Sequence, residues 1–305
     1  MKYIYGPVPS RRMGLSLGIS PIPKKTCNYS CIYCQLGRTD HMTGERRMFF
    51  PVSEIVSELE ALKKEKFRFD VVTIVGEGEP LLYLGIGELL EDIRRLTERP
   101  IAVITNGSLL GDGSIQRELA AADIVLPSLD AVDSDGFRKI NRAHKSIVFE
   151  NMLEGLIDFS HNYKGQLWLE IMLLKGFNDD PKTLEAFALI LKKIKYERLY
   201  INTPVRPPAE DNVQKPDNRT IEHAIDLLGG ISLDHLISEG FQSDIEDHEQ
   251  AVMSIIKRHP MNRFEIEGFL ESRKCIDTDK ILDQLRSNVL LTSKFYKGYE
   301  TFRFK

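Results

Sequence analysis

Short apolar runs alternate along the chain with longer stretches in which apolar residues recur at helical spacing. The short runs are rich in Val and Ile, and they predict buried strands at residues 15–19, 71–75, 101–105, 124–128, 167–173 and 199–203. The stretches between them predict helices at 53–66, 86–98, 114–121, 147–159 and 181–193. Because a parallel sheet is buried on both faces, strands without polar alternation favour an α/β fold with helices covering the sheet. About six βα units predict a partial (βα)6 barrel, with reactive groups at the carboxyl ends of its strands.

The pattern changes after residue 203. Residues 204–217 (PVRPPAEDNVQKPD) are polar and Pro-rich and predict a loop that closes the barrel, followed by a helix at 220–228. Three short helical patterns at 246–259, 263–273 and 277–287 then precede a hairpin pattern at 289–304, which turns at Lys297-Gly298. Three helices and a hairpin indicate a winged helix-turn-helix of about 60 residues. We therefore expect two domains, residues 1–230 and 244–305.

Composition narrows the class of protein. The 305 residues are 42% hydrophobic and 28% charged, which excludes disordered and collagen-like sequence, and the formal charge of -4 excludes a polycation built for indiscriminate nucleic-acid binding. No apolar run approaches the roughly 18 to 20 residues of a membrane-spanning helix, and the first residues lack the layout of a secretory signal. We expect a soluble, cytoplasmic protein with no membrane partner.

Positive charge is concentrated at the two ends of the sequence. Residues 1–50 carry eight basic and two acidic side chains, which leaves -10 for the rest. This segment is either a solvated basic surface or a source of positive charge beside the cysteines, for an anionic substrate or a thiolate-bound cluster. Residues 286–305 carry a net +4, although residues 245–305 as a whole hold 11 basic and 10 acidic side chains. The C-terminal domain could contact nucleic acid, but protein recognition or domain docking fits this balance better.

Three of the four cysteines lie within eight residues, directly after the first predicted strand. Cys27, Cys31 and Cys34 form a C-x-x-x-C-x-x-C loop that can wrap three corners of an iron–sulfur cubane. A structural zinc site needs four ligands, usually in two pairs, and no second pair exists here, although His41 could complete a Cys3His set. Cys275 is expected to be a small buried residue of the C-terminal domain. Three ligands for four irons leave one iron open to an exogenous ligand.

The run TCNYSCIYC resembles the signature of the radical S-adenosylmethionine (SAM) superfamily, and Tyr33 matches its usual aromatic position. The resemblance covers residues 14–205. It implies a [4Fe–4S] cluster on Cys27, Cys31 and Cys34, with SAM bound through its amino and carboxylate groups to the unique iron. It also implies reductive cleavage of SAM to a 5′-deoxyadenosyl radical, a hydrogen-donating substrate, and an electron donor such as flavodoxin or ferredoxin.

Further matches follow the predicted strands in order. Residues 76–80 (GEGEP) resemble the superfamily's GGEP element, which implies that Gly78, Glu79 and Pro80 bind SAM, with Glu79 on its ammonium group; Glu77 departs from the pattern. The alternative interpretation is a simple glycine turn. The resemblance also implies SAM contacts after the third and fourth strands, from Thr105, Asn106, Ser128 and Asp130. As bare tripeptides these positions would be ordinary turns.

Two charged residues complete the candidate site. Glu170 lies inside the fifth strand, where a buried carboxylate needs a partner, so it either lines the lumen or forms a salt bridge. Arg206 follows the sixth strand and could pair with Glu170 or with the SAM carboxylate. The sequence does not single out a catalytic residue beyond these cofactor contacts.

The opening GPVPSRRMGLSLGIS together with CNYSCIYCQLGRT resembles a branch similar to wyosine-type tRNA synthases. Those enzymes use additional N-terminal cysteines for a second cluster, and no cysteine precedes Cys27. RNA and protein therefore both stand as substrate classes. The competing hypothesis is a non-enzymatic iron–sulfur or zinc sensor whose winged helix reads DNA, in which Gly78, Glu79, Asn106 and Asp130 would be expendable.

Overall fold

The computed structural model describes residues 2–63, 68–233, 240–241, 243, 245–296 and 299–305. Its largest element is an eight-stranded sheet in the order β1-β2-β5-β6-β7-β8-β9-β10, parallel from β2 to β10. The strands are β1 (Ile4–Ser10), β2 (Gly14–Ile19), β5 (Val71–Ile74), β6 (Ile101–Thr105), β7 (Ile124–Pro127), β8 (Gln166–Met172), β9 (Arg198–Asn202) and β10 (Ile231–Ser232). Among the described residues β1 and β10 form the two edges, so the sheet is an open barrel. The predicted α/β class and parallel sheet are confirmed.

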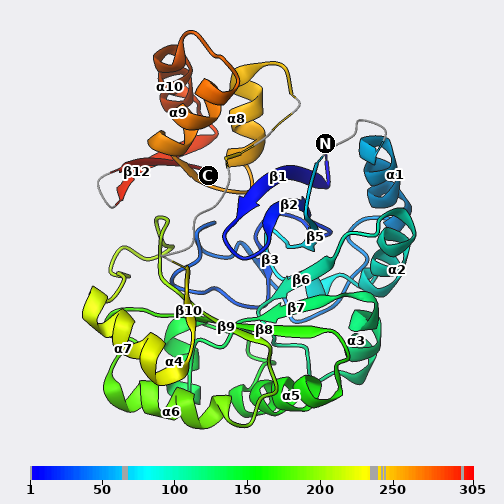
Figure 1. The fold of residues 1–305 in the computed structure, drawn as a ribbon, viewed down its shortest axis with the longest axis vertical. Coiled ribbons are helices and arrows are strands. Elements are labelled where there is room, and N and C mark those ends of the chain that lie inside the picture. The colour runs from blue at the N-terminus through cyan, green and yellow to red at the C-terminus, as the bar shows by residue number, and fades with distance from the viewer. Residues whose placement is uncertain (1, 64–67, 234–239, 242, 244, 297–298) are drawn as a thin grey trace.

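Helices cover the outside of this sheet as an arc (Figure 1). They are α1 (Val52–Lys63), α2 (Ile86–Leu96), α3 (Gly113–Glu118), α4 (Ser134–Ile140), α5 (Phe149–Asn162), α6 (Pro181–Leu191) and α7 (Asn218–Leu228), with 3-10 turns η1 (Pro80–Leu82) and η2 (Leu119–Ala121). Apolar residues of the strands, such as Val72, Val103 and Leu169, are fully buried against helical residues such as Ile93 and Phe187. Burial on both faces explains why the strands contain so few polar residues.

Edge strand β1 was not among the strands predicted from the sequence. It runs antiparallel to β2, and its register shifts between Tyr5 and Val8. Pro7 and Pro9 lie within it, and proline is tolerated at a sheet edge or a bulge because no ladder hydrogen bond is lost there. The two prolines therefore concealed a strand that the sheet accommodates only at its edge.

The C-terminal segment forms a smaller unit with its own core. Its elements are α8 (His248–Ile256), β11 (Met261–Asn262), α9 (Arg263–Ser272), α10 (Thr278–Ser287), β12 (Leu291–Tyr296) and β13 (Tyr299–Phe304), with strand order β11-β13-β12. Ile255, Leu270 and Phe302 are buried in this core, and Tyr5 and Val8 of β1 pack into it. The barrel and the C-terminal unit are therefore joined through β1 (Figure 1).

Some of the elements predicted for the C-terminal region are present in the structure, and others lie outside the residues that it describes. The three predicted helices and the hairpin strands are present, while the identification as a winged helix-turn-helix stays a prediction. The Lys297-Gly298 turn, the start of the second domain at residue 244 and the end of the first predicted helix at 64–66 lie outside the described residues. Cys275 is half-buried against the C-terminal core. Within the described parts of the chain, no helix is long and apolar enough to cross a membrane.

Candidate functional site

The three clustered cysteines lie on the loop that follows β2. Cys27 ends the short strand β3 (Thr26–Cys27), which pairs in parallel with β4 (His41–Met42), so the loop carrying Cys31 and Cys34 is closed at its base. The N–H of Cys34 donates to the carbonyl oxygen of Cys31 at 3.1 Å, which folds these two residues into one turn. All three thiols are free and half-buried.

Helix α4, which the sequence analysis did not predict, fixes the far side of the cysteine loop. The N–H of Ser30 donates to the carbonyl of Asn141 at 3.0 Å, and the N–H of Ile32 donates to the carbonyl of Ile140 at 2.9 Å. Asn141 is the C-cap of α4, and its side-chain amide donates to Cys31 Sγ at 3.6 Å. The end of one helix therefore sets both the path of the loop and the surroundings of the second sulfur.

Hydrogen-bond donors also point at Cys27. Its Sγ lies 3.3 Å from the backbone nitrogen of Tyr29 and 3.8 Å from Nδ2 of Asn106. Burial raises the pKa of the Cys27 thiol to about 12 and that of Cys31 well above its ordinary value. If these sulfurs bind a metal, the thiols would lose their protons, and the donors would stabilise the thiolates.

The donor set fits a cluster better than a single ion. Within the described ranges, no three His, Cys, Asp or Glu side chains converge as ligands of one metal ion. His41, the residue that could have completed a zinc site, is exposed on β4. A body of several irons spreads its thiolate ligands more widely than one ion does. Three half-buried thiols with amide donors at two of the sulfurs suit a cluster that keeps one corner for an exogenous ligand.

The turn at residues 76–80 packs directly against the strand that carries Cys27. A Cβ on Gly78 would stand 1.8 Å from the carbonyl oxygen of Thr26, so only glycine permits this approach. The same carbonyl accepts a hydrogen bond from the N–H of Glu79 at 3.1 Å. Gly78 therefore holds the turn against the cysteine loop, which the sequence motif alone did not reveal.

Glu79 is the centre of a buried network that brings several predicted site residues together. Its carboxylate accepts hydrogen bonds from Thr105 Oγ1 at 2.6 Å, from the N–H of Asn106 at 2.7 Å and from the N–H of Leu81 at 2.9 Å. Pro80 opens η1, for which Glu79 is the N-cap. Burial raises the pKa of Glu79 to about 7, and the three donors oppose that shift. A cation placed beside this carboxylate would stabilise its charged form.

Asp130 forms a second network on the other side of the cysteine loop. Its carboxylate accepts hydrogen bonds from Tyr33 Oη at 2.5 Å, from Asn141 Nδ2 at 2.8 Å and from the N–H of Met172 at 3.0 Å. Burial raises the pKa of Asp130 to about 6, while these donors lower it. Asp130 therefore links the aromatic residue before the third cysteine to β8 and to the end of α4.

Glu170 is ion-paired, but with a residue other than the one predicted. Arg12 donates through Nε to Glu170 at 2.8 Å, and its Nη2 lies 2.5 Å from the same oxygen. Asn202 donates to the other carboxylate oxygen at 3.0 Å. The half-buried Ser128 lies alongside, in a parallel bridge with Glu170. Of the two partners considered for Arg206, Glu170 is wrong, and the SAM carboxylate stays a prediction.

Arg206 instead turns toward the C-terminal unit. Its guanidinium donates to both carboxylate oxygens of Glu265 at 2.9 Å and lies 2.6 Å from Nε2 of His259. Glu265 is in the first turn of α9. The loop after β9 therefore places Arg206 against the C-terminal helices, where it joins the two units of the chain.

Residues 22–206, more than half of the chain, match the family model described as the Radical SAM superfamily. The chain belongs to the radical SAM superfamily. Members of this superfamily use a [4Fe–4S] cluster and SAM, and the protein is accordingly a radical SAM enzyme. The matched segment contains the three cysteines, the Glu79 network and the Asp130 network.

The chain is also similar to curated relatives, and a solved structure shares its fold. It is 36% identical to the UPF0026 protein MJ1312 of Methanocaldococcus jannaschii, over 88% of this chain and 86% of the relative. It is 41% identical to a Brachyspira hyodysenteriae protein named GTPase Obg over 73% of this chain, and it spans only 33% of that protein. Streptococcus suis SuiB bound to S-adenosylmethionine shares the fold with a TM-score of 0.54 and 19% identity, over 71% of this chain and 48% of SuiB.

Proposed function

We propose that Cys27, Cys31 and Cys34 hold three irons of a [4Fe–4S] cluster and that the fourth iron binds the amino and carboxylate groups of SAM. The observation that carries this proposal is the position of Asn106. Its side-chain amide lies 3.8 Å from Cys27 Sγ, while its backbone N–H donates to the Glu79 carboxylate at 2.7 Å. One residue therefore connects a candidate cluster ligand to the buried carboxylate that would hold the SAM ammonium.

When bound, the cluster and SAM together supply a one-electron cleavage of the S–C5′ bond and a carbon radical that abstracts hydrogen from a substrate. In this proposal the residues of the chain bind and orient SAM. Glu79 accepts the ammonium group, with Gly78 and Pro80 shaping its turn, while Thr105 and Ser128 present hydroxyl groups at the carboxyl ends of β6 and β7.

The Asp130 network has a positioning role in this proposal. Asp130 accepts from Tyr33 and from Asn141, so it fixes the cysteine loop and an amide donor to Cys31 at the same time. Glu170 lies near the neighbouring strand ends, and its negative charge is balanced by Arg12. Arg206 is held by Glu265 and therefore contributes to domain docking rather than to a pairing with Glu170.

The proposal extends to the cellular context and the substrate class. We infer a cytoplasmic enzyme of two domains, residues 1–230 and 244–305, that receives electrons from a donor such as flavodoxin or ferredoxin. The topology α8-β11-α9-α10-β12-β13 suits a winged helix, which supports RNA as one substrate class and protein as another. The non-enzymatic sensor is disfavoured, because Glu79 and Asn106 are built into one network with Cys27.

The test is an anaerobic assay of the reconstituted protein with SAM and a low-potential reductant. The proposal expects 5′-deoxyadenosine to form in the wild type and in Cys275→Ala, and to form more slowly in Glu79→Gln when SAM is not saturating. Cys275 is the matched control because it lies in the C-terminal core, outside the cysteine loop. Intact SAM combined with specific DNA binding would favour the sensor and overturn the proposal.

A further inference from the structure

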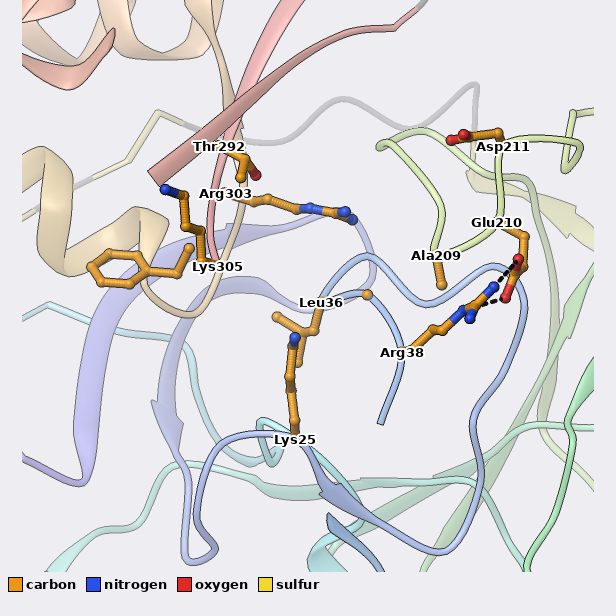
Figure 2. A pocket seen from close by; sticks show the side chains of 11 residues that line it. Lys25, Leu36, Arg38, Ala209, Glu210, Asp211, Thr292, Arg303 and Lys305 are labelled. Carbon is orange, nitrogen blue, oxygen red and sulfur yellow. Dashed lines mark hydrogen bonds and ion pairs between the residues drawn. The ribbon is translucent and has the colours of Figure 1, made fainter. Parts of the chain in front are cut away.

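A cavity of about 430 Å³ lies where the cysteine loop meets the C-terminal hairpin (Figure 2). Its wall is built from three segments that are distant in sequence: Lys25 with residues 36–38, residues 209–211, and the strands β12 and β13. A volume of this size is within the usual range for a small-molecule site. None of the Glu79 network lines it, so it is distinct from the proposed SAM site.

The two acidic residues in the wall are already paired. Glu210 accepts from Arg38 Nε at 2.8 Å and Nη2 at 2.9 Å, and from Arg142 at 2.5 Å. Asp211 forms an ion pair with Lys294 of β12. Their negative charges are therefore balanced in large part by cations around the rim, and neither carboxylate forms a hydrogen bond or ion pair with Arg303 or Lys25 in the described part of the chain.

On the opposite wall lie two cationic side chains that have few anionic partners within the protein. Arg303 of β13 forms no side-chain hydrogen bond or ion pair with the described residues, and its Nη1 is buried without a partner. Lys25 has only Asp40, at 3.4 Å, and that carboxylate is 58% exposed. Unpaired buried donors of a guanidinium group are costly, and an anionic ligand would satisfy them.

Arg303 and Lys25 converge on the same point of the loop. A Cβ on Gly37 would stand 3.7 Å from Lys25 Nζ and 3.9 Å from Arg303 Cζ. Figure 2 shows Arg303 entering from the C-terminal hairpin and Lys25 rising from the cysteine loop toward the same space. Thr292 adds a hydroxyl group to the wall. A guanidinium, an ammonium and a hydroxyl around one cavity form a set of donors for an anion with several oxygens.

We propose that this cavity binds a phosphate group of a ligand, with Arg303 and Lys25 as the two cationic contacts. The remaining volume is larger than one phosphate and leaves space for the group that carries it. Gly37, which lines the cavity, donates its N–H to the carbonyl oxygen of Cys34 at 3.1 Å. The site therefore places a phosphate-bearing molecule beside the third cysteine, and it requires the C-terminal hairpin to be docked. The phosphate could belong to a free nucleotide or to an RNA backbone.

The experiment measures binding by the anaerobically reconstituted full-length protein with three probes: inorganic pyrophosphate, AMP and a short single-stranded RNA. We expect at least one probe to bind, and Arg303→Gln and Lys25→Gln each to weaken its binding about tenfold, because a charge-assisted hydrogen bond is lost. Lys280→Gln, which removes an exposed lysine of α10, is the matched control and should bind as the wild type does.

The pattern of binding identifies the source of the phosphate. Binding of pyrophosphate or AMP supports a small phosphorylated ligand, whereas binding of RNA alone supports a nucleic-acid backbone. The two variants lie on different elements, so a folding defect of one, detected by its iron content and circular dichroism, leaves the other as the test. The proposal is overturned if no probe binds at millimolar concentrations, or if both properly folded variants bind as tightly as the wild type. No SAM cleavage is measured, so failure here leaves the radical SAM assignment intact.

Discussion

The guanidinium of Arg258 lies 3.5 Å from the carboxylate of Glu77, and both side chains are buried. Glu77 immediately precedes the Gly78-Glu79-Pro80 turn, and Arg258 follows α8 of the C-terminal unit. Arg258 also donates through Nη2 to the carbonyl of Lys2 at 2.7 Å. Glu77, which departs from the glycine expected in the motif, is therefore the point at which the C-terminal unit contacts the proposed SAM-binding turn.

Removing the charge of Glu77 should destabilise the protein. Glu77→Gln keeps the shape of the side chain but leaves Arg258 buried without a counter-charge, so we expect a loss of about 3 kcal/mol in the free energy of unfolding. In a double-mutant cycle with Arg258→Met, the loss of stability in the double variant should be smaller than the sum of the two single losses by about 1 to 3 kcal/mol. Denaturant titration of the four proteins measures this coupling, and additive losses would show that the pair does not interact.

Glu79→Gln should weaken SAM binding without loss of the cluster. Thr105 and the N–H of Asn106 donate to different oxygens of Glu79, so the substitution keeps an acceptor for only one of them, and it removes the negative charge that would pair with the ammonium. We expect the Kd for SAM to rise about 10- to 100-fold, the cost of one charged hydrogen bond. Equilibrium binding of SAM to iron-replete protein measures the effect. An unchanged Kd would remove Glu79 from the binding site.

Gly78→Ala should disturb the contact between the motif turn and β3. The new Cβ would stand 1.8 Å from the Thr26 carbonyl oxygen, which is backbone and has little freedom to move. We expect a loss of about 1 to 3 kcal/mol in stability and a lower iron content, because Cys27 is the next residue. Gly268→Ala is the control: Gly268 lies in α9 with no atom within 4 Å of an added Cβ, and alanine favours the helix. Equal behaviour of the two variants would contradict the assigned role of Gly78.

His259 should make stability depend on pH. Burial, with Arg206 and Arg11 nearby, lowers the pKa of His259 well below its ordinary value, so the folded state binds fewer protons than the unfolded state below about pH 6.5. The free energy of unfolding should therefore fall as the pH drops below that value. His259→Gln should reduce the slope of unfolding free energy against pH by the equivalent of about one bound proton. His223→Gln, on the exposed face of α7, is the control. Urea titrations at a series of pH values measure both slopes, and an unchanged slope in His259→Gln would refute this origin.

The central strands could be predicted from the sequence because burial on both faces leaves only apolar residues in them. Edge strand β1 could not, because its prolines are compatible with a strand only where no neighbour needs the missing N–H. Helix α4 is short and was not recognised, although its last residues hold the cysteine loop.

Some residues of the candidate site could likewise be predicted from the sequence, and others could not. Glu79, Thr105 and Asn106 follow strands whose carboxyl ends meet at one edge of the sheet, so their positions along the chain placed them together. Arg12 could not be assigned to Glu170, because the two residues are 158 positions apart and Arg12 lies in the turn between β1 and β2, which depends on an edge strand that was not predicted. Arg206 was assigned to the wrong partner for a related reason: its true partner, Glu265, belongs to the C-terminal unit, whose docking the sequence does not specify.

The proposed function depends on three clustered thiolates that hold a cluster with one iron open to SAM. The most direct measurement is iron content together with the electron paramagnetic resonance spectrum of the reduced protein, with and without SAM, in the wild type, Cys34→Ala and Cys275→Ala. The wild type and Cys275→Ala should bind about four irons per chain and show a spectrum that changes on addition of SAM, while Cys34→Ala should lose most of its iron. Full iron stoichiometry in Cys34→Ala, or a wild-type spectrum that SAM leaves unchanged, would contradict the account.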